Sequence, residues 1–526
     1  VAAFAEPFRM RILLPIDEPP DLLYRLITHE LTHQFAFDIV PRSFLRQQPP
    51  LWVDEGLADY MAGVWNPLDL MAVRDAALSD TLPAMSEFVR GRQFANPRLV
   101  YNLGHAAFEF IEDRWGKEGV REFLFSLRKT VIGGGGDIYE DAFDISAEEF
   151  DLAFERYIHD RFQAFRDKER PDDYGRDLAP DPIETRYLAV YSIEPSPSGD
   201  LIAAVAINRK DREYDIVLFS SENGDVVKNL TDGFDQDFGF ESIALPGARW
   251  NQVPWMSWSG VDDRMAYFVR KNKYRSLVLQ HVVTRDIEEM IDLNTVDAPE
   301  SPDISPDGRT VAFSALQNGI GDIYLLDLGT QEVTNLTADE FADYAPTFSP
   351  DGSFLVYLAR ISGNNKLFKL DLETKEKTQL TFGTFSEAAA QFVDDHTLVF
   401  SSTATDPLLP VDPAMAANGD IFNIWTLDLN NGELRQFTDT ATGNVSAIVL
   451  PGEDETRIAF VTYFKGEYGV HTIVRDEPLY TASTTDYGAP GPNIDFQAPL
   501  THTVISANAR RKGRFEKMFL EGTPPI

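Results

Sequence analysis

Two histidines and two glutamates near the start of the chain have the types and spacing of a metal-activated hydrolytic site. His29-Glu30-Leu31-Thr32-His33 is an H-E-x-x-H pattern. On a helix, residues four apart share a face, so His29 and His33 can present their imidazoles to one ion. Glu30 lies about 100° around that helix, close enough to act on a water beside the ion. Glu55 can supply a third ligand and leave a fourth position open, which is typical of catalytic zinc.

A helix between proline breakers must position this pattern. Residues 21–38 place leucine, isoleucine and phenylalanine side chains at largely helical spacing. Pro19 and Pro20 precede this run and Pro41 follows it, which suits the two ends of a helix. Histidine is rare, with 8 in 526 residues. A chance H-E-x-x-H therefore has odds on the order of one in a hundred.

The H-E-x-x-H helix and the later segment WVDEGLADY (52–60) together resemble the gluzincin metallopeptidases, and most of all the peptidase MA-like group. In those proteins a W-x-x-E-G-x-A-x-Y segment brings the glutamate ligand. The resemblance covers about residues 8–165. It implies that His29, His33 and Glu55 bind Zn²⁺ and that Glu30 is the general base. The interval from His33 to Glu55 is longer than in the best-known members, which implies a longer loop between the helices.

Asp59 is a candidate for a supporting role. It lies four residues after Glu55 and therefore on the same helix face. Some gluzincins use a carboxylate at this spacing to hold the distal N–H of a histidine ligand. The alternative is a solvated helix carboxylate.

A second helix near the site is expected at 97–115, after the N-cap residue Asn96 and before Gly116. Tyr101 and His105 are four apart on one face of it. A tyrosine hydroxyl or an imidazole N–H can stabilise the oxyanion of peptide hydrolysis. The alternative for both residues is a place at the rim of a helical core.

Composition excludes several classes of function. Net charge is −37, from 47 basic and 84 acidic residues, which argues against nucleic-acid binding and favours repulsion from anionic lipid. The sequence has no uninterrupted apolar run of 18 residues, so we expect no membrane-spanning helix. Cysteine is absent, which rules out disulfides and cysteine-ligated metals. This absence is compatible with a periplasmic or extracellular protein.

Both ends of the chain predict a longer natural protein. Only about twenty residues precede the metal-binding helix, room for one strand at 11–16. Gluzincins usually carry more sheet there, so we expect an extension upstream of Val1 that includes any export signal. A membrane-anchored region beyond Ile526 is a further alternative, which would make this chain the soluble half of an outer-membrane protein.

The helical pattern continues to about Phe165. Ser146 and Glu149 form a capping box that opens its last helix. Residues 166–185 are charged and proline-rich, which indicates a linker. We therefore expect a mainly α (α+β) zincin-like metallopeptidase domain at 1–165, truncated at its N-terminus, followed by a linker.

The second half of the chain is repetitive. Residues 305–336 recur as 349–381 with a period of 44, and looser copies begin near 196, 258, 392 and 450. A period of 40–45 with short hydrophobic strands is typical of a β-propeller. The region 186–485 resembles the WD40-like propeller of TolB and its relatives. Six blades are expected, followed by a C-terminal extension at 486–526; the blades would span 186–234, 253–291, 301–341, 345–385, 389–443 and 445–485.

Two details of the ring are also predicted. Ring closure is expected to pair 185–190 with the last blade near 469–474, which removes an open sheet edge. Trp250, Trp255 and Trp258 form either a recognition patch or blade core. The insertion at 234–252 is the better candidate for a specific contact.

These patterns predict an extracytoplasmic zinc peptidase that acts on a peptide or protein substrate. The expected location is periplasmic or extracellular, with outer-membrane association as an option. The propeller would dock an envelope protein partner or gate the substrate; as an alternative, it only orients the peptidase. A second hypothesis is a catalytically idle peptidase fold acting as an interaction or assembly subunit of an envelope complex. Lack of the upstream sheet in the mature protein would favour that hypothesis, because the sheet edge normally aligns the substrate.

Overall fold

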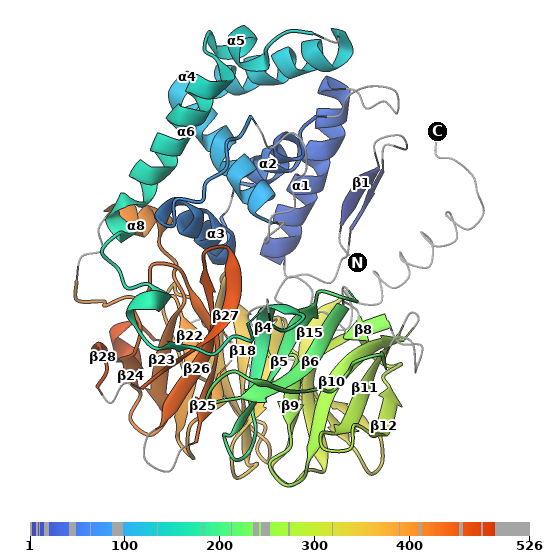
Figure 1. Cartoon of the computed structure of the whole chain (residues 1–526). Helices are drawn as coiled ribbons and strands as arrows, with labels where there is room; N and C mark the ends of the chain where they lie inside the picture. Colours follow the sequence, from blue (N-terminus) through green and yellow to red (C-terminus); the bar gives the residue numbers. More distant parts are fainter. Residues whose placement is uncertain are drawn as a thin grey trace.

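The computed structural model contains a helical region that sits on one face of a ring of sheets (Figure 1). It describes residues 3–489, except for 7–8, 10, 15–19, 41–48, 64, 87–97, 134, 182–183, 212, 235–240, 244–252, 272–273, 318, 389, 410–412, 452–455 and 475–476.

The helical region begins with a short antiparallel hairpin, followed by six helices. Its elements are β1 (Phe4–Glu6), β2 (Arg11–Leu13), α1 (Pro20–Ile39), α2 (Leu51–Ala62), α3 (Pro67–Leu78), α4 (Leu99–Gly133), α5 (Ile138–Phe143) and α6 (Ala147–Phe162). The helix expected at 21–38 is α1. The capping box of Ser146 and Glu149 opens α6 as predicted. The expected strand at 11–16 corresponds to β2, and residues 15–16 lie outside the described residues.

Helix α4 corresponds to the helix expected at 97–115 and extends beyond it. Gly116 has φ 71° and ψ −178°, so the first helical segment does break there. The chain then resumes helical conformation as far as Gly133 instead of leaving the helix. Glycine reaches this positive φ without the steric penalty that a side chain would bring. The predicted N-cap Asn96 lies outside the described residues.

Helices α2 and α4 cross with their backbones in direct contact. A Cβ added to Gly56 would lie 2.4 Å from the Cα of Gly104, and one added to Gly104 would lie 2.3 Å from the carbonyl oxygen of Trp52. The Trp52 ring is buried beside Phe108, with ring centroids 6.0 Å apart. Two glycines thus allow an approach that no other residue permits. Glu55 precedes Gly56, so this crossing fixes its place beside α4.

Six sheets form the ring, which confirms the six-bladed β-propeller. Blade one contains β4 (Tyr187–Pro195), β5 (Leu201–Asn208), β6 (Glu213–Ser220) and β7 (Val226–Asn229). Blade two contains β8 (Glu241–Ile243), β9 (Met256–Trp258), β10 (Arg264–Lys271), β11 (Tyr274–His281) and β12 (Ile287–Asp292). Blade three contains β13 (Asp297–Ile304), β14 (Thr310–Gln317), β15 (Ile320–Asp327) and β16 (Val333–Asn335).

Blades four to six complete the ring. Blade four contains β17 (Asp343–Phe348), β18 (Phe354–Ile361), β19 (Asn364–Asp371) and β20 (Lys377–Gln379). Blade five contains β21 (Gln391–Phe392), β22 (Thr397–Ser402), β23 (Asn423–Asp428), β24 (Glu433–Gln436) and β28 (Tyr480–Ser483). Blade six contains β25 (Asn444–Leu450), β26 (Arg457–Phe464), β27 (Glu467–Ile473) and β3 (Arg176–Asp177). A short helix, α8 (Pro413–Asn418), lies in the long loop between β22 and β23.

The repeated turn tag has a structural role in each blade that carries it. The Ser305 and Ser349 hydroxyls accept hydrogen bonds from the N–H groups of Thr310 and Phe354, at 3.0 and 3.1 Å. Ser196 does the same for Leu201. The hydroxyl holds the turn between the first and second strands, which explains why the serine recurs with the period of the repeat.

Ring closure differs from the prediction. The strand that pairs with the last blade is β3, with Asp177 opposite His471 and Arg176 opposite Thr472. Residues 471–472 fall inside the predicted stretch, but 185–190 leads into β4, an edge strand of blade one that pairs with β5. The segment 166–185 is therefore part of the ring as well as a linker. Strand β28 joins blade five, not blade six.

A buried arginine joins the helical region to the propeller. The Arg74 side chain in α3 is fully buried and donates hydrogen bonds to the carbonyl oxygens of Asn418, Ala441 and Thr442, at 3.0, 2.6 and 2.7 Å. Its neighbour Asp75 accepts hydrogen bonds from two backbone N–H groups of the turn between β26 and β27. The helical core also continues into the propeller. The two regions therefore share one packed interface.

Two of the three tryptophans belong to blade packing. Trp255 is buried, with its ring stacked against Tyr191 at 6.3 Å, and Trp258 lies in β9. Trp250 and most of the predicted contact insertion at 234–252 lie outside the described residues. Among the described helices, none is both long and apolar enough to cross a bilayer.

Candidate metal centre

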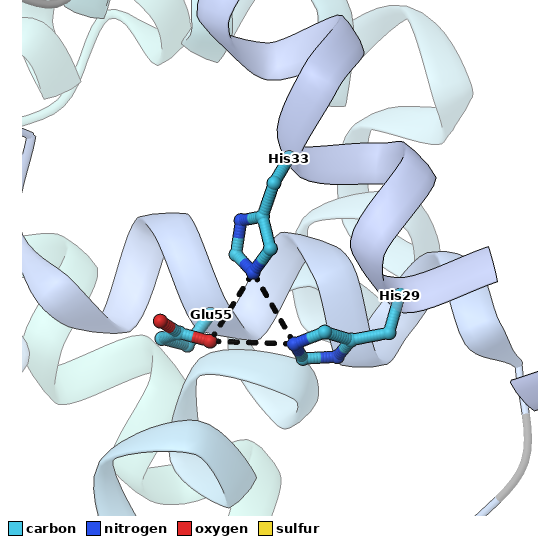
Figure 2. A group of neighbouring side chains, drawn as sticks. All are labelled: His29, His33 and Glu55. Carbon is cyan, nitrogen blue, oxygen red and sulfur yellow. Dashed lines mark hydrogen bonds and ion pairs between the residues drawn. The ribbon is translucent and has the colours of Figure 1, made fainter. Parts of the chain in front are cut away.

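Helices α1 and α2 bring His29, His33 and Glu55 to one point (Figure 2). The Nε2 atoms of the two histidines are 3.2 Å apart, and each lies 3.4 Å from Oε2 of Glu55. In the described part of the chain, this is the one group of three or more such side chains with mutually close ligand atoms.

The three atoms have the spacing that a tetrahedral zinc ion imposes. Zn–N bonds of about 2.0–2.1 Å and Zn–O bonds of about 2.0–2.2 Å, at tetrahedral angles, place neighbouring ligand atoms roughly 3.3–3.6 Å apart. The observed separations of 3.2–3.4 Å are close to that range. Two imidazoles and one carboxylate are also the donors that zinc accepts at a catalytic site. The residues therefore fit the ion that the sequence resemblance implies.

A carboxylate lies behind each histidine ligand. Nδ1 of His29 is 2.9 Å from Oδ1 of Asp59, a hydrogen-bond distance, and Nδ1 of His33 is 3.7 Å from Oδ1 of Asp54, an ion-pair distance. With a carboxylate at Nδ1, each imidazole keeps Nε2 directed toward Glu55. Asp54 was not among the sequence candidates. Helical spacing gives no signal for it, because Asp54 lies five residues before Asp59 and about 140° away around the helix.

Opposite charges face each other in the cluster. Burial raises the pKa of the Glu55 carboxyl, but hydrogen bonds from His29 and His33 outweigh this effect and lower it to about 2. Burial lowers the pKa of His33, and Asp54 and Glu55 together raise it to about 10. Burial likewise opposes ionisation of Asp59, whose pKa is nevertheless lowered by His29 and nearby arginines. At neutral pH the cluster thus pairs the Glu55 carboxylate with a protonated His33, which must release its proton when a cation binds there.

Glu30 and Tyr101 border this cluster. Glu30 is only 5% exposed, and burial raises its pKa while the charges of both histidines lower it. Tyr101, in the first turn of α4, is half-buried, and burial together with the charge of Glu55 raises its pKa to about 12. Its hydroxyl is therefore protonated at neutral pH and can donate a hydrogen bond.

His105 has different surroundings. Its ring stacks on Trp65 with centroids 4.0 Å apart, and its Nε2 lies 3.6 Å from Glu109. Burial lowers its pKa to about 4. It lines a cavity of about 1,010 Å³ whose described lining includes Tyr60 and Arg161 but none of the three candidate ligands. The contacts of His105 therefore place it in a neighbouring cavity and give no support to a role at the cluster.

Comparisons with known proteins bear on the propeller. Residues 249–412 match the family described as "TolB beta propeller domain". Among solved structures, TolB from Acinetobacter baumannii is similar at 15% identity and a TM-score of 0.35, covering 64% of this chain and 72% of that one. A putative TolB from Agrobacterium tumefaciens gives 13% identity and a TM-score of 0.36, covering 55% and 91%.

A structure from a study of two prolyl endopeptidases gives 14% identity and a TM-score of 0.36, covering 61% of this chain and 46% of that one. These likenesses are too remote to carry an argument about function. A search of curated proteins finds no match. The family match and the ring of six sheets together show a TolB-like six-bladed β-propeller joined to an N-terminal helical region.

Proposed function

We propose that the helical region is a zinc metallopeptidase of the gluzincin type and that the propeller docks a protein partner or gates the substrate. The observation that carries the proposal is the approach of His29, His33 and Glu55, whose ligand atoms lie 3.2–3.4 Å apart. The buried acid Glu30 next to that cluster supplies the proton acceptor that peptide hydrolysis requires.

The residues divide the chemistry between them. The two histidines and Glu55 would hold Zn²⁺, which would supply a Lewis acid for the scissile carbonyl and lower the pKa of a bound water. Glu30 accepts a proton from the attacking water and delivers it to the leaving amine. The protonated Tyr101 hydroxyl donates to the carbonyl oxygen as negative charge develops on it.

The second candidate is an idle peptidase fold that serves as an interaction subunit. A TolB-like propeller supports protein docking whether or not the helical region is active. We also propose a location outside the cytoplasm, in the bacterial envelope. Both candidates share the propeller, so peptide hydrolysis is the property that separates them.

The test compares wild type, Glu30→Gln, His33→Ala and the exposed control Glu122→Gln, each measured for zinc content and for cleavage of a broad peptide library. Glu30→Gln should keep zinc and lose about 10²–10⁴-fold in kcat, because an amide cannot accept the proton. His33→Ala should lose zinc, since two ligands remain. Glu122→Gln should behave as wild type. A zinc-loaded wild type that cleaves no peptide would establish the idle subunit instead.

A further inference from the structure

The Asp59 carboxylate has a hydrogen-bond partner on each oxygen, and Arg25 lies 3.8 Å from Oδ1 as an ion-pair partner. Oδ1 lies 2.9 Å from Nδ1 of His29, and Oδ2 lies 3.2 Å from Nη2 of Arg98. Asp59 is buried, with 3% of its surface exposed. A buried carboxylate needs charge compensation as well as hydrogen bonds. Arg98 therefore supplies part of what keeps this carboxylate ionised and in place behind the histidine.

The Arg98 guanidinium is itself held in a fixed position. Its Nε and Nη2 atoms donate to the two oxygens of Asp69, at 3.0 and 3.1 Å, which is a two-pronged contact. Arg25 also donates to Asp69, at 3.1 Å. Asp69 belongs to α3, Arg25 to α1 and Asp59 to α2, so Arg98 is anchored by elements that surround the cluster. These hydrogen bonds to Asp69 and Asp59 fix the orientation of the planar guanidinium.

The same guanidinium reaches the candidate oxyanion donor. The Cζ atom of Arg98 lies 5.0 Å from the centre of the Tyr101 ring, within the range of a cation–π contact. Arg98 immediately precedes α4, and Tyr101 lies in its first turn. One side chain thus touches both the carboxylate behind His29 and the tyrosine that borders Glu55.

We infer that Arg98 is a positioning residue, which holds Asp59 against His29 and the Tyr101 ring at the mouth of the metal cluster. This inference rests on the proposed function for its catalytic part and on zinc binding for the rest. Sequence spacing gives no sign of its contact with Asp59, because the two carboxylate partners of Arg98 lie 29 and 39 residues away.

The test compares wild type with Arg98→Met, Arg98→Lys and Arg128→Met. Zinc affinity is measured by chelator competition, and kcat and KM are measured on the peptide that wild type cleaves fastest. Arg128 is a matched control because it donates to carbonyl oxygens at the end of α1, 2.9 Å from that of Ile39, without touching the cluster. Arg98→Met should weaken zinc binding about 10–100-fold, as loss of a ligand-orienting contact does. It should also lower kcat while leaving KM within about twofold, since the loss falls on the transition state.

The zinc affinity and kcat of Arg98→Lys should be intermediate, because lysine keeps the positive charge but cannot form the paired hydrogen bonds to both oxygens of Asp69. Arg128→Met should match wild type in all three quantities. Zinc affinity unchanged in Arg98→Met would overturn the inference; if that variant does not fold, unchanged affinity in Arg98→Lys overturns it instead. Zinc affinity also decides the matter if wild type proves inactive, which keeps failure of the inference separate from failure of the proposed function.

Discussion

The two regions of this molecule are held together in different ways. In the propeller one polar contact recurs: Thr231, Thr337, Thr381 and Thr438 each accept a hydrogen bond from a backbone N–H in the third strand of their own blade, at 2.9–3.0 Å. In the helical region the decisive contacts occur once each. Examples are the crossing of Gly56 and Gly104 and the contacts of Arg98 around the candidate ligands.

This difference predicts how each region responds to change. A repeated contact contributes one part of a stability that neighbouring blades share, so losing one copy has a small and local cost. A contact made once has no substitute, and several such contacts converge on the metal cluster. Mutations in the helical region should therefore affect fold and chemistry together, whereas similar mutations in a blade should affect stability alone.

The largest effect is expected from Gly56→Ala. The added methyl group would lie 2.4 Å from backbone atoms of Gly104, so α2 and α4 must separate and carry Glu55 with them. We expect a loss of about 3 kcal/mol in the free energy of unfolding, the upper end for overpacking, together with weaker zinc binding. Gly133→Ala is the control, because its Cβ would meet nothing within 4 Å. Denaturant unfolding of both variants checks this; equal stability would contradict the close crossing.

Arg74→Met should come next and should break the interface between the regions. Three buried carbonyl oxygens would lose their donor, at a cost of about 1 kcal/mol or more each. We expect calorimetry to resolve two unfolding transitions in this variant, with the helical region melting first. Arg121→Met, on an exposed face of α4, should leave the wild-type profile unchanged. One sharp transition in Arg74→Met would show that the shared apolar core and the Asp75 contacts suffice to couple the regions.

Glu194→Gln should reveal a pH-dependent contribution in the propeller centre. Burial and the charge of Asp303 raise the pKa of Glu194 to about 8, although Trp258 and Gln391 donate hydrogen bonds to it. For an acid with a raised pKa, the stability is fully present below about pH 4.5 and is lost as pH rises toward 8. Glu194→Gln removes that loss. Relative to wild type it should gain a few kcal/mol at pH 8, since each pKa unit between 4.5 and about 8 contributes about 1.4 kcal/mol, and less than about 1 kcal/mol at pH 5.

Thermal unfolding at the two pH values measures this gain. An equal difference between variant and wild type at both pH values would mean that Glu194 titrates in its ordinary range. Zinc binding should be the same in both proteins, because Glu194 lies in β4 of the propeller and the metal cluster lies in the helical region.

The smallest effect is expected from Thr381→Val, which removes one copy of the repeated threonine contact. The N–H of Leu367 loses its acceptor, at a cost of about 1 kcal/mol. Thr337→Val and Thr438→Val should cost similar amounts, and none of the three should alter zinc binding. Urea unfolding of the three variants tests the comparison, and a tenfold change in zinc affinity in any of them would contradict it.

Much of the fold was predictable because its signals are local. The periodic leucines and phenylalanines of α1, the capping box at Ser146 and the recurring serine turns each act within a few residues. Helix α3 was missed because its buried face carries Arg74 and Asp75, whose partners belong to the propeller. Strand β3 was missed because two charged residues show no strand alternation.

The residues of the candidate site could likewise be predicted only where their signals are local. Helical spacing suggested that His29 and His33 share a point, and the resemblance to gluzincins added Glu55. In the structure the three ligand atoms are close; zinc binding itself stays a prediction. The spacing rule also suggested Asp59 behind a histidine. Arg98 could not be found this way, because Asp59 and Asp69 reach it from two other helices.

Strand β3 has a consequence for how the chain is made. The ribosome synthesises Arg176 and Asp177 before any other strand of the ring. Their partners in β27 are synthesised much later, near the end of the described chain. The helical region can thus fold while synthesis continues, but β3 must wait without a partner until blade six emerges. The ring therefore stays open until β27 has been synthesised, and a nascent chain stalled before β27 carries an open sheet edge that invites association with other chains.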